Sequence, residues 1–241
     1  METNTVKNFY NTTLQNNPTP YEQERWFKSG QHRAGYGATK KAMQKYALPL
    51  LQNDVKVFEL GPGPGTWTKL MLEHAPQAEY NLVDISKEML QQAKEALSTH
   101  QNISYITSDI LEYSVDDQYD FFFSSRILEY VPDKNRAVHN IVQAMHSGAY
   151  GYLVTKTPQE GRIFSKRKGS QIHSLQISAN DLIKIFQEHG CVVHKKIHVT
   201  CVFPKMHSGF LDSLLTSVCT LLPFASVNVF SESYAIVFQK K

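Results

Sequence analysis

The chain has 241 residues, of which 41% are hydrophobic, so it is long enough for one domain with a substantial core. Its 25 Lys and Arg residues are nearly balanced by 22 Asp and Glu residues, and the net charge of +3 argues against a nucleic-acid-binding surface. The short basic run at 166–168 is expected to be a solvated loop, because phosphate binding needs several spaced contacts. The three cysteines show no Cys-x-x-Cys spacing, which argues against a disulfide framework and a structural zinc site.

The sequence shows neither a secretory signal nor a membrane span. The first residues, METNTVKNFYNTT, contain no apolar run of about seven residues, the minimum for a signal peptide. The longest apolar stretch, FLDSLLTSVCTLLPF at 210–224, is interrupted by Asp212 and is too short to cross a bilayer. Because the cysteines also argue against a disulfide framework, we expect a cytoplasmic protein.

Strands and helices alternate through the central part of the chain. A polar, loose segment over the first twenty residues is followed by an expected helix at 38–51. The expected strands are then 55–60, 80–83, 103–107, 119–124 and 150–155, and the expected helices are 65–74, 86–97 and 133–145. This alternation requires crossover connections, so it predicts a doubly wound, Rossmann-like α/β fold with a mostly parallel sheet and helices on both faces.

The last third of the chain departs from this alternation. Ser178 is expected to cap a helix that Gly190 ends, as Ser86 is expected to cap the helix after the second strand. A strand at 191–203, an apolar segment at 206–224 and an antiparallel C-terminal strand at 234–238 complete the prediction.

A glycine-rich turn, within VFELGPGPGTWT at 57–68, joins the first strand to a helix. Gly61, Gly63 and Gly65 expose backbone N–H groups and allow a ligand to lie against the main chain. The dinucleotide motif G-x-G-x-x-G would need glycine at position 66, where Thr66 stands, and the two intervening prolines remove N–H donors. A ligand with less negative charge than a pyrophosphate fits this turn better.

This stretch resembles the first motif of the class I S-adenosylmethionine-dependent methyltransferases, in which an acid precedes G-x-G-x-G. The resemblance covers roughly residues 35–200 and is strongest over 55–155. It implies S-adenosyl-L-methionine as the cofactor, bound at Glu59, the three glycines and Thr66.

Two further acids follow the next two strands. Asp84, in YNLVDISKEML, can accept hydrogen bonds from both ribose hydroxyls, with Ile85 beside it; the alternative is an aspartate that only ends a strand. The resemblance implies that Asp109, in ITSDILEY, accepts from the adenine amino group while the N–H of Ile110 meets the ring. We expect Glu59, Asp84 and Asp109 to surround one adenosyl pocket at the carboxyl edge of the sheet.

The fourth motif is YDFFFSSRILEYVPD at 119–133, where the resemblance implies a loop facing the methionine part of the cofactor. Ser125 and Arg126 are expected to contact the cofactor, although Arg126 could instead pair with a neighbouring acid. The family often has L-E-H-V here, and this chain has Tyr130 in place of the histidine. An unperturbed tyrosine has a pKa of about 10, so we expect Tyr130 to shape the pocket or orient the substrate.

A second catalytic candidate and two further cofactor contacts lie outside these motifs. SQIHSLQISANDLIKIFQEHGCVV resembles a portion of ubiquinone-pathway-like and glycan- or lipid-modifying methyltransferases, which makes His173 a candidate; the alternative is an ordinary loop histidine. Near the N-terminus, the resemblance implies a helix over the cofactor, with Arg33 and Tyr36 as candidates for the methionine carboxylate; a solvent-facing helix is the alternative. Of the ten histidines, His194 and His198 share a strand face but lack a third ligand, so no metal site is expected.

The resemblance implies transfer of a methyl group to the O- or N-nucleophile of a small molecule by in-line displacement. We expect an N-terminal segment or cap at 1–34 and a cofactor-binding domain at 35–241. A segment at about 203–230 would shape the site for an apolar or lipid-linked acceptor; the alternatives are a homodimer face or core packing. A nicotinamide-dependent oxidoreductase and a non-catalytic protein that keeps the fold are the competing functions. A nucleic-acid acceptor is disfavoured, because SSRILEY replaces an Asn/Asp-Pro-Pro-Tyr-like motif.

Overall fold

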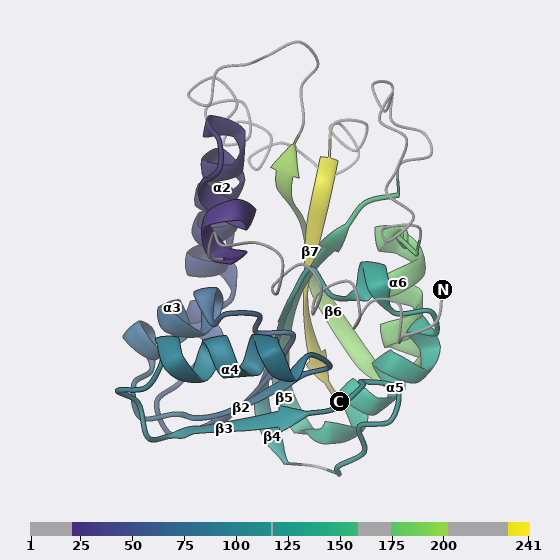
Figure 1. Ribbon diagram of the computed structural model, residues 1–241. Coiled ribbons are helices and arrows are strands. Elements are labelled where there is room, and N and C mark those ends of the chain that lie inside the picture. Colours follow the sequence, from purple (N-terminus) through teal and green to yellow (C-terminus); the bar gives the residue numbers. More distant parts are fainter. Residues whose placement is uncertain (1–20, 117, 159–174, 202–230) are drawn as a thin grey trace.

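The structure of the protein, a computed structural model, describes residues 21–116, 118–158, 175–201 and 231–241. These residues form one seven-stranded sheet in the order β3-β2-β1-β4-β5-β7-β6 (Figure 1). The strands are β1 (Lys56–Leu60), β2 (Glu79–Asp84), β3 (Ile103–Thr107), β4 (Tyr119–Ser125), β5 (Met145–Lys156), β6 (Cys191–Cys201) and β7 (Ser231–Lys240).

The sheet is mostly parallel. The five strands β1 to β5 pair in parallel, whereas β7 pairs antiparallel with both β5 and β6. The central strand β4 shows why the sequence favours this arrangement, since consecutive Phe121, Phe122 and Phe123 are each at most 1% exposed. A strand buried on both faces needs a continuous apolar run, which is typical of parallel sheets covered by helices. The predicted fold class is confirmed, including the antiparallel C-terminal strand.

Helices cover both faces of the sheet. The helices are α2 (Gly30–Tyr46), α3 (Thr66–His74), α4 (Lys87–Ala96), α5 (Lys134–Ala144) and α6 (Ala179–Glu188), with short helical turns η1 (Gln23–Phe27), η2 (Leu48–Leu50) and η3 (Leu128–Tyr130). Met43, Trp67 and Leu90 belong to one buried cluster, which places α2, α3 and α4 on one face. Val138 and Leu182 belong to the other, which places α5 and α6 on the opposite face (Figure 1).

The helix starts follow the predicted capping residues. The side chain of Ser86 accepts a hydrogen bond from the Met89 N–H at 3.2 Å, and α4 begins at the next residue. Ser178 Oγ accepts from the Asp181 N–H at 3.2 Å in the same way at the start of α6. Both hydroxyls satisfy an N–H group that has no partner within the helix.

Several boundaries differ from the prediction, two of them at the start of an element by five residues or more. The first long helix begins at Gly30 rather than at 38, with the Ser29 side chain as its cap, and therefore crosses the predicted segment boundary at 34. It contains Gly35 and Gly37, and glycine is a poor helix former, so the sequence pattern placed the start after them. Strand β5 begins at Met145 rather than at 150, because its first residue already pairs with Tyr119 of β4.

The apolar segment predicted at 203–230 lies outside the described residues. Within the described part of the chain, no helix combines the length and the apolar character needed to cross a bilayer.

Candidate active site

The glycine turn after β1 is fixed by its own packing. Gly61, Gly63 and Gly65 have φ angles of 70°, 55° and 86°, a region that favours glycine. A methyl group on Gly61 would lie 2.1 Å from Ile127 Cδ1, and one on Gly65 would lie 3.0 Å from Leu97 Cδ1. A methyl group on Gly63 would have no heavy atom within 4 Å. Positive φ therefore disfavours a side chain at all three positions, packing against Ile127 and Leu97 adds to this at the outer glycines, and Gly63 leaves open space.

Acidic side chains stand at the ends of β2 and β3. Asp84 accepts a hydrogen bond from the Ser86 N–H at 2.9 Å. Burial raises the pKa of Asp84 to about 6, although the backbone N–H groups of Ser86, Gly63 and Ile85 oppose the shift. Since this value is below neutral pH, Asp84 is predominantly a carboxylate at pH 7.

One pocket with an empty volume of about 1040 Å³, partly open to solvent, brings most of the predicted site residues together. It lies at the carboxyl ends of β1 and β4, where the strand order reverses direction, which is the usual ligand position in open α/β sheets. The predicted residues in its lining are Gly61, Gly63 and Thr66 from the glycine turn, Asp84, Ile85, Asp109 and Ile110 from the ends of β2 and β3, and Ser125, Arg126 and Tyr130 from the end of β4 and the following loop.

Two buried hydroxyls in the pocket lining lack a hydrogen-bond partner. Thr66 Oγ1 and Ser125 Oγ are both inaccessible to solvent and make no hydrogen bond in the structure. Buried polar groups are nearly always paired, so two unpaired hydroxyls in one pocket indicate that a polar ligand completes the site. Together with two acids and a glycine-rich turn, they fit a nucleoside with a short polar extension.

Glu59 does not line this pocket. It is 1% exposed, and its Oε2 accepts a hydrogen bond from Thr68 Oγ1 at 2.7 Å within the core. Burial raises the pKa of Glu59 to about 8, an effect that the Thr68 hydroxyl opposes and the charge of Asp84 reinforces. The expectation that three acids surround one pocket is therefore corrected: Asp84 and Asp109 line it, while Glu59 lies in the core behind the turn.

The N-terminal contribution comes from residues other than the two predicted ones. Arg33 is exposed and donates to the Phe27 carbonyl at 3.1 Å, and Tyr36 stacks on Trp67 with ring centroids 5.3 Å apart. Neither lines the pocket, and neither does Gly65. Tyr21, Arg25 and Trp26 line it instead, from η1 and the residues just before it.

The sequence prediction missed these three residues because it chose Arg33 and Tyr36 from the family resemblance. The aromatic and basic character of YEQERWF was the available signal.

The structure describes only one of the two predicted catalytic residues. Tyr130 lines the pocket, whereas His173 lies outside the described residues. Among the described residues, no group of three or more His, Cys, Asp or Glu side chains is arranged to hold a metal ion.

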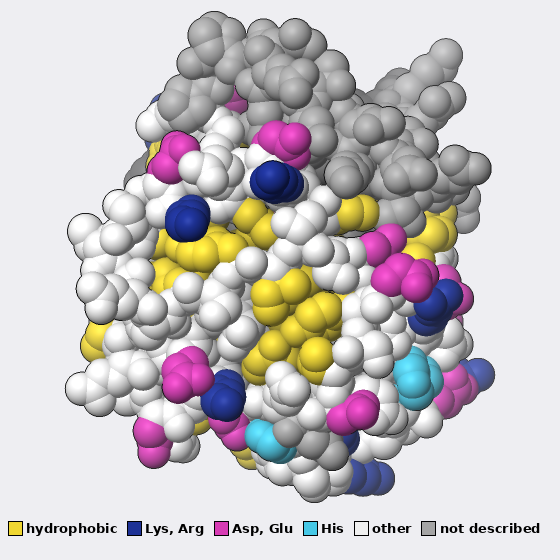
Figure 2. Space-filling model, turned by 60° about the horizontal axis from the view of Figure 1, so that its bottom comes forward, with side chains coloured by type: hydrophobic (Ala, Val, Ile, Leu, Met, Phe, Trp, Pro, Cys, Tyr) yellow, Lys and Arg dark blue, Asp and Glu magenta, His cyan; other side chains and the backbone are white. Residues whose placement is uncertain are grey.

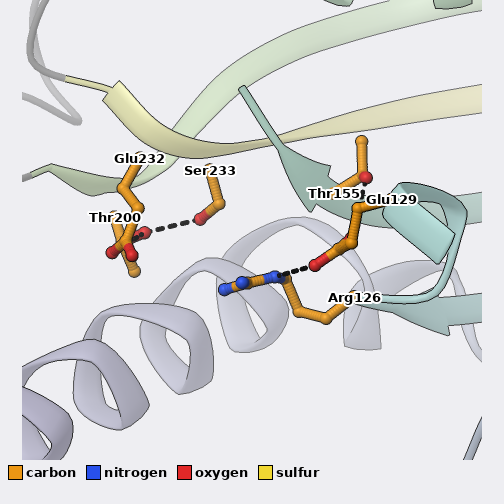
Figure 3. A network of polar contacts seen from close by, with 6 residues as sticks. All are labelled: Arg126, Glu129, Thr155, Thr200, Glu232 and Ser233. Carbon is orange, nitrogen blue, oxygen red and sulfur yellow. Dashed lines mark hydrogen bonds and ion pairs between the residues drawn. The ribbon is translucent and has the colours of Figure 1, made fainter. Parts of the chain in front are cut away.

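Arg126 lines the pocket and also pairs with a neighbouring acid. From the sequence these two positions were alternatives, and the structure shows both. Its Nε donates to Glu129 Oε1 at 2.7 Å, and Glu129 Oε2 accepts from Thr155 Oγ1 at 2.9 Å. Figure 3 shows the guanidinium between Glu129 and the side of β7 that carries Glu232.

Burial disfavours the charge on Arg126, but the negative charge of Glu129 outweighs this and raises the pKa of the arginine. For Glu129, burial is likewise outweighed by the charge of Arg126, which lowers the pKa of the glutamate. Both groups are ionised at neutral pH.

Comparison with known proteins finds similarity to methyltransferases. Residues 57–148 match the family model described as a methyltransferase domain. The chain is 25% identical over 170 residues to a malonyl-[acyl-carrier protein] O-methyltransferase of Acetivibrio thermocellus, an alignment that covers 69% of this chain and 57% of the relative. It is 31% identical over 103 residues to a trans-aconitate 2-methyltransferase of Rhodopseudomonas palustris, covering 43% of this chain and 38% of the relative. The chain thus spans less than two thirds of the length of these relatives.

The fold is shared with a solved methyltransferase. The N-methyltransferase NodS from Bradyrhizobium japonicum, in complex with S-adenosyl-L-homocysteine, superposes with a TM-score of 0.62 at 14% identity, covering 97% of this chain and 98% of NodS. At this identity the likeness shows the fold alone. Residues 57–148 therefore match a methyltransferase domain, and the chain shares the fold of a solved methyltransferase.

Proposed function

We propose that the protein transfers a methyl group from S-adenosyl-L-methionine to a small-molecule acceptor. The observation that carries this proposal is the pocket beside the glycine turn, which gathers Asp84, Asp109 and the unpaired hydroxyls of Thr66 and Ser125. A non-catalytic scaffold would have no need of unpaired hydroxyls in a pocket, because each costs desolvation free energy.

Different residues of the pocket are suited to bind different parts of the cofactor. Asp84, ionised at neutral pH, is suited to accept hydrogen bonds from ribose hydroxyls, and Asp109 with the N–H of Ile110 is suited to the adenine. Gly63 allows the main chain to approach the cofactor directly, and Ser125 offers a hydroxyl from the end of β4.

When bound, S-adenosylmethionine supplies a methyl group activated by a sulfonium, which becomes a neutral thioether after in-line transfer. The protein has to position the acceptor and exclude water, since the cofactor brings the reactive centre. Tyr21, Trp26 and Tyr130 form the part of the lining that can shape the acceptor space.

A small acceptor is supported by the surface and by the relatives. On the face shown in Figure 2, Lys and Arg side chains are interspersed with Asp and Glu rather than gathered into one basic area. The relatives are named for malonyl-[acyl-carrier protein] and trans-aconitate as acceptors. A cytoplasmic location agrees with Cys191 and Cys201, which are both free thiols and buried.

The test is a search for the methylated product. Purified protein is incubated with a small-metabolite extract and S-adenosylmethionine carrying a deuterated methyl group, and labelled products are identified by mass spectrometry. The proposal predicts a product that carries the label in the presence of the protein and not with an Asp84→Asn variant. Cofactor binding without any labelled product from extracts of several organisms would contradict the proposed activity.

A further inference from the structure

The charged residues of the pocket are separated along the sheet edge. Asp84 and Asp109 follow β2 and β3, on one side of β1, whereas Arg126 follows β4 on the other side. Arg25, from η1, lines the pocket as well. The pocket therefore has an acidic end suited to a nucleoside and a cationic part that the nucleoside contacts proposed above do not use.

Arg126 is held rigidly in this position. Its φ of 69° lies in the left-handed region, which a non-glycine residue adopts only when its surroundings enforce it. Its side chain is 13% exposed, the salt bridge to Glu129 uses only Nε, and the negative charge of Glu232 also acts on the guanidinium. Within the described residues the two terminal nitrogens make no hydrogen bond, so they can form a fork that binds a carboxylate through two parallel hydrogen bonds.

Arg25 is available for the same ligand. Its guanidinium lies 4.4 Å from the centroid of the Trp26 ring, a cation–π contact that orients it without neutralising its charge. In the part of the chain that the structure describes, Arg25 forms no ion pair.

Lys156, at the end of β5, lies near both the arginines and the acids of this part of the site. Burial lowers its pKa to about 8, and the positive charges of Arg126 and, more weakly, Arg25 add to this effect, while Glu232 and Glu129 oppose it.

The described lining also offers no histidine as a proton acceptor. A carboxylate nucleophile needs no base, because it is already deprotonated at neutral pH, and an amine needs only to be neutral. A phenol or sugar hydroxyl would need one.

We propose that Arg126 and Arg25 bind a carboxylate of the methyl acceptor, which makes the acceptor a small carboxylic acid. This inference rests on the proposed methyltransferase function, and it assigns to the two arginines the role of selecting the acceptor. The same fork could in principle meet the carboxylate of the cofactor's methionine part, and the experiment separates these two sources.

The two tryptophans of the chain, Trp26 and Trp67, both line the pocket, so intrinsic fluorescence reports its occupancy independently of turnover. Protein saturated with S-adenosylhomocysteine is titrated with butyrate, succinate and tricarballylate, and with their neutral amides. The inference predicts a saturable fluorescence change with at least one of these acids and none with the amides. Calorimetry provides the dissociation constants.

The variants are Arg25→Gln and the double variant Arg126→Gln/Glu129→Gln, which avoids leaving Glu129 buried and unpaired. The matched control is Arg136→Gln, since Arg136 forms an exposed ion pair with Glu112. Each pocket variant should weaken acid binding about tenfold or more, as expected for a lost charge-assisted hydrogen bond, and leave the affinity for S-adenosylhomocysteine within about threefold. The control should change neither.

Three results would overturn the inference. The first is binding of S-adenosylhomocysteine with no response to any of the acids. The second is that the variants bind S-adenosylhomocysteine more weakly than the wild type but bind methylthioadenosine, which lacks the carboxylate, equally well. This result would assign the arginines to the cofactor. The third is failure of the wild-type protein to bind S-adenosylhomocysteine at all, which removes the proposed function first and this inference with it.

Discussion

Nε of Arg126 lies 2.7 Å from Oε1 of Glu129, and these two ionised side chains are 13% and 0% exposed beside the pocket. The pair joins the residue after β4 to η3, and Thr155 of β5 holds the second carboxylate oxygen. Since each charge is the main compensation for burial of the other, removing one leaves a buried charge without its partner.

The first prediction concerns this pair. Glu129→Ala should lower the free energy of unfolding by about 3 kcal/mol, the cost typical of breaking a buried salt bridge from one side. Glu112→Ala, which removes the exposed pair with Arg136, should cost less than about 1 kcal/mol. Urea denaturation followed by circular dichroism measures both, and equal costs would show that Arg126 and Glu129 are not a buried pair.

The second prediction concerns Glu59 and pH. Burial raises the pKa of Glu59 to about 8, so its carboxyl group favours the folded state while protonated, and this contribution is lost as pH rises through that value. Glu59→Gln keeps an acceptor for the Thr68 hydroxyl and removes the titration. Relative to the wild type, the variant should gain about 2 kcal/mol of stability between pH 6 and pH 8.5. A difference that stays constant over this range would mean that Glu59 is ionised throughout.

The third prediction concerns Gly63. Gly63→Ala places a methyl group in open space of the protein, so its stability cost should be about 1 kcal/mol, from the positive φ alone. If the cofactor lies against this turn, however, the methyl group should lower its affinity by about tenfold or more. Gly148→Ala is the matched control, because Gly148 also has positive φ and open surroundings but lies away from the pocket. Equal cofactor affinities of the two variants in calorimetry would place the cofactor elsewhere.

The fourth prediction is the pH dependence of cofactor binding. Burial raises the pKa of Asp84 to about 6, and the ionised form is the one suited to the ribose hydroxyls. The dissociation constant of S-adenosylhomocysteine should therefore rise about tenfold as pH falls from 7.5 to 5, where about a tenth of Asp84 stays ionised. Asp84→Asn should bind weakly at both pH values and show little pH dependence. A wild-type affinity that does not change over this range would exclude Asp84 as the titrating contact.

The sequence predicted those features that depend on local chemistry. The caps Ser86 and Ser178, the strand at 103–107 and the acids at the ends of β2 and β3 follow from residue type and spacing, and the structure has all of them. The position of Glu59 could not be predicted in the same way. Its distance from the pocket depends on which face of β1 it occupies and on Thr68, nine residues away.

The N-terminal residues that line the pocket were predicted wrongly for another reason. Trp26 contacts Trp67 with ring centroids 5.2 Å apart, and this tertiary contact accompanies a long helix through Gly35 and Gly37, against their low helix propensity. The single-residue preferences pointed to a later helix start, and the choice of Arg33 and Tyr36 as contacts rested on the family resemblance alone. Arg25, which does line the pocket, belongs to a short turn that carries no periodic signal.

The most direct test of the account is calorimetric titration of the wild-type protein with S-adenosylhomocysteine at pH 7.5, beside Asp84→Asn and the exposed control Asp54→Asn. The account predicts one site with a dissociation constant of about micromolar size for the wild type and the control, and a loss of about tenfold or more for Asp84→Asn. Absence of binding by the wild type, or equal binding by all three proteins, would contradict it.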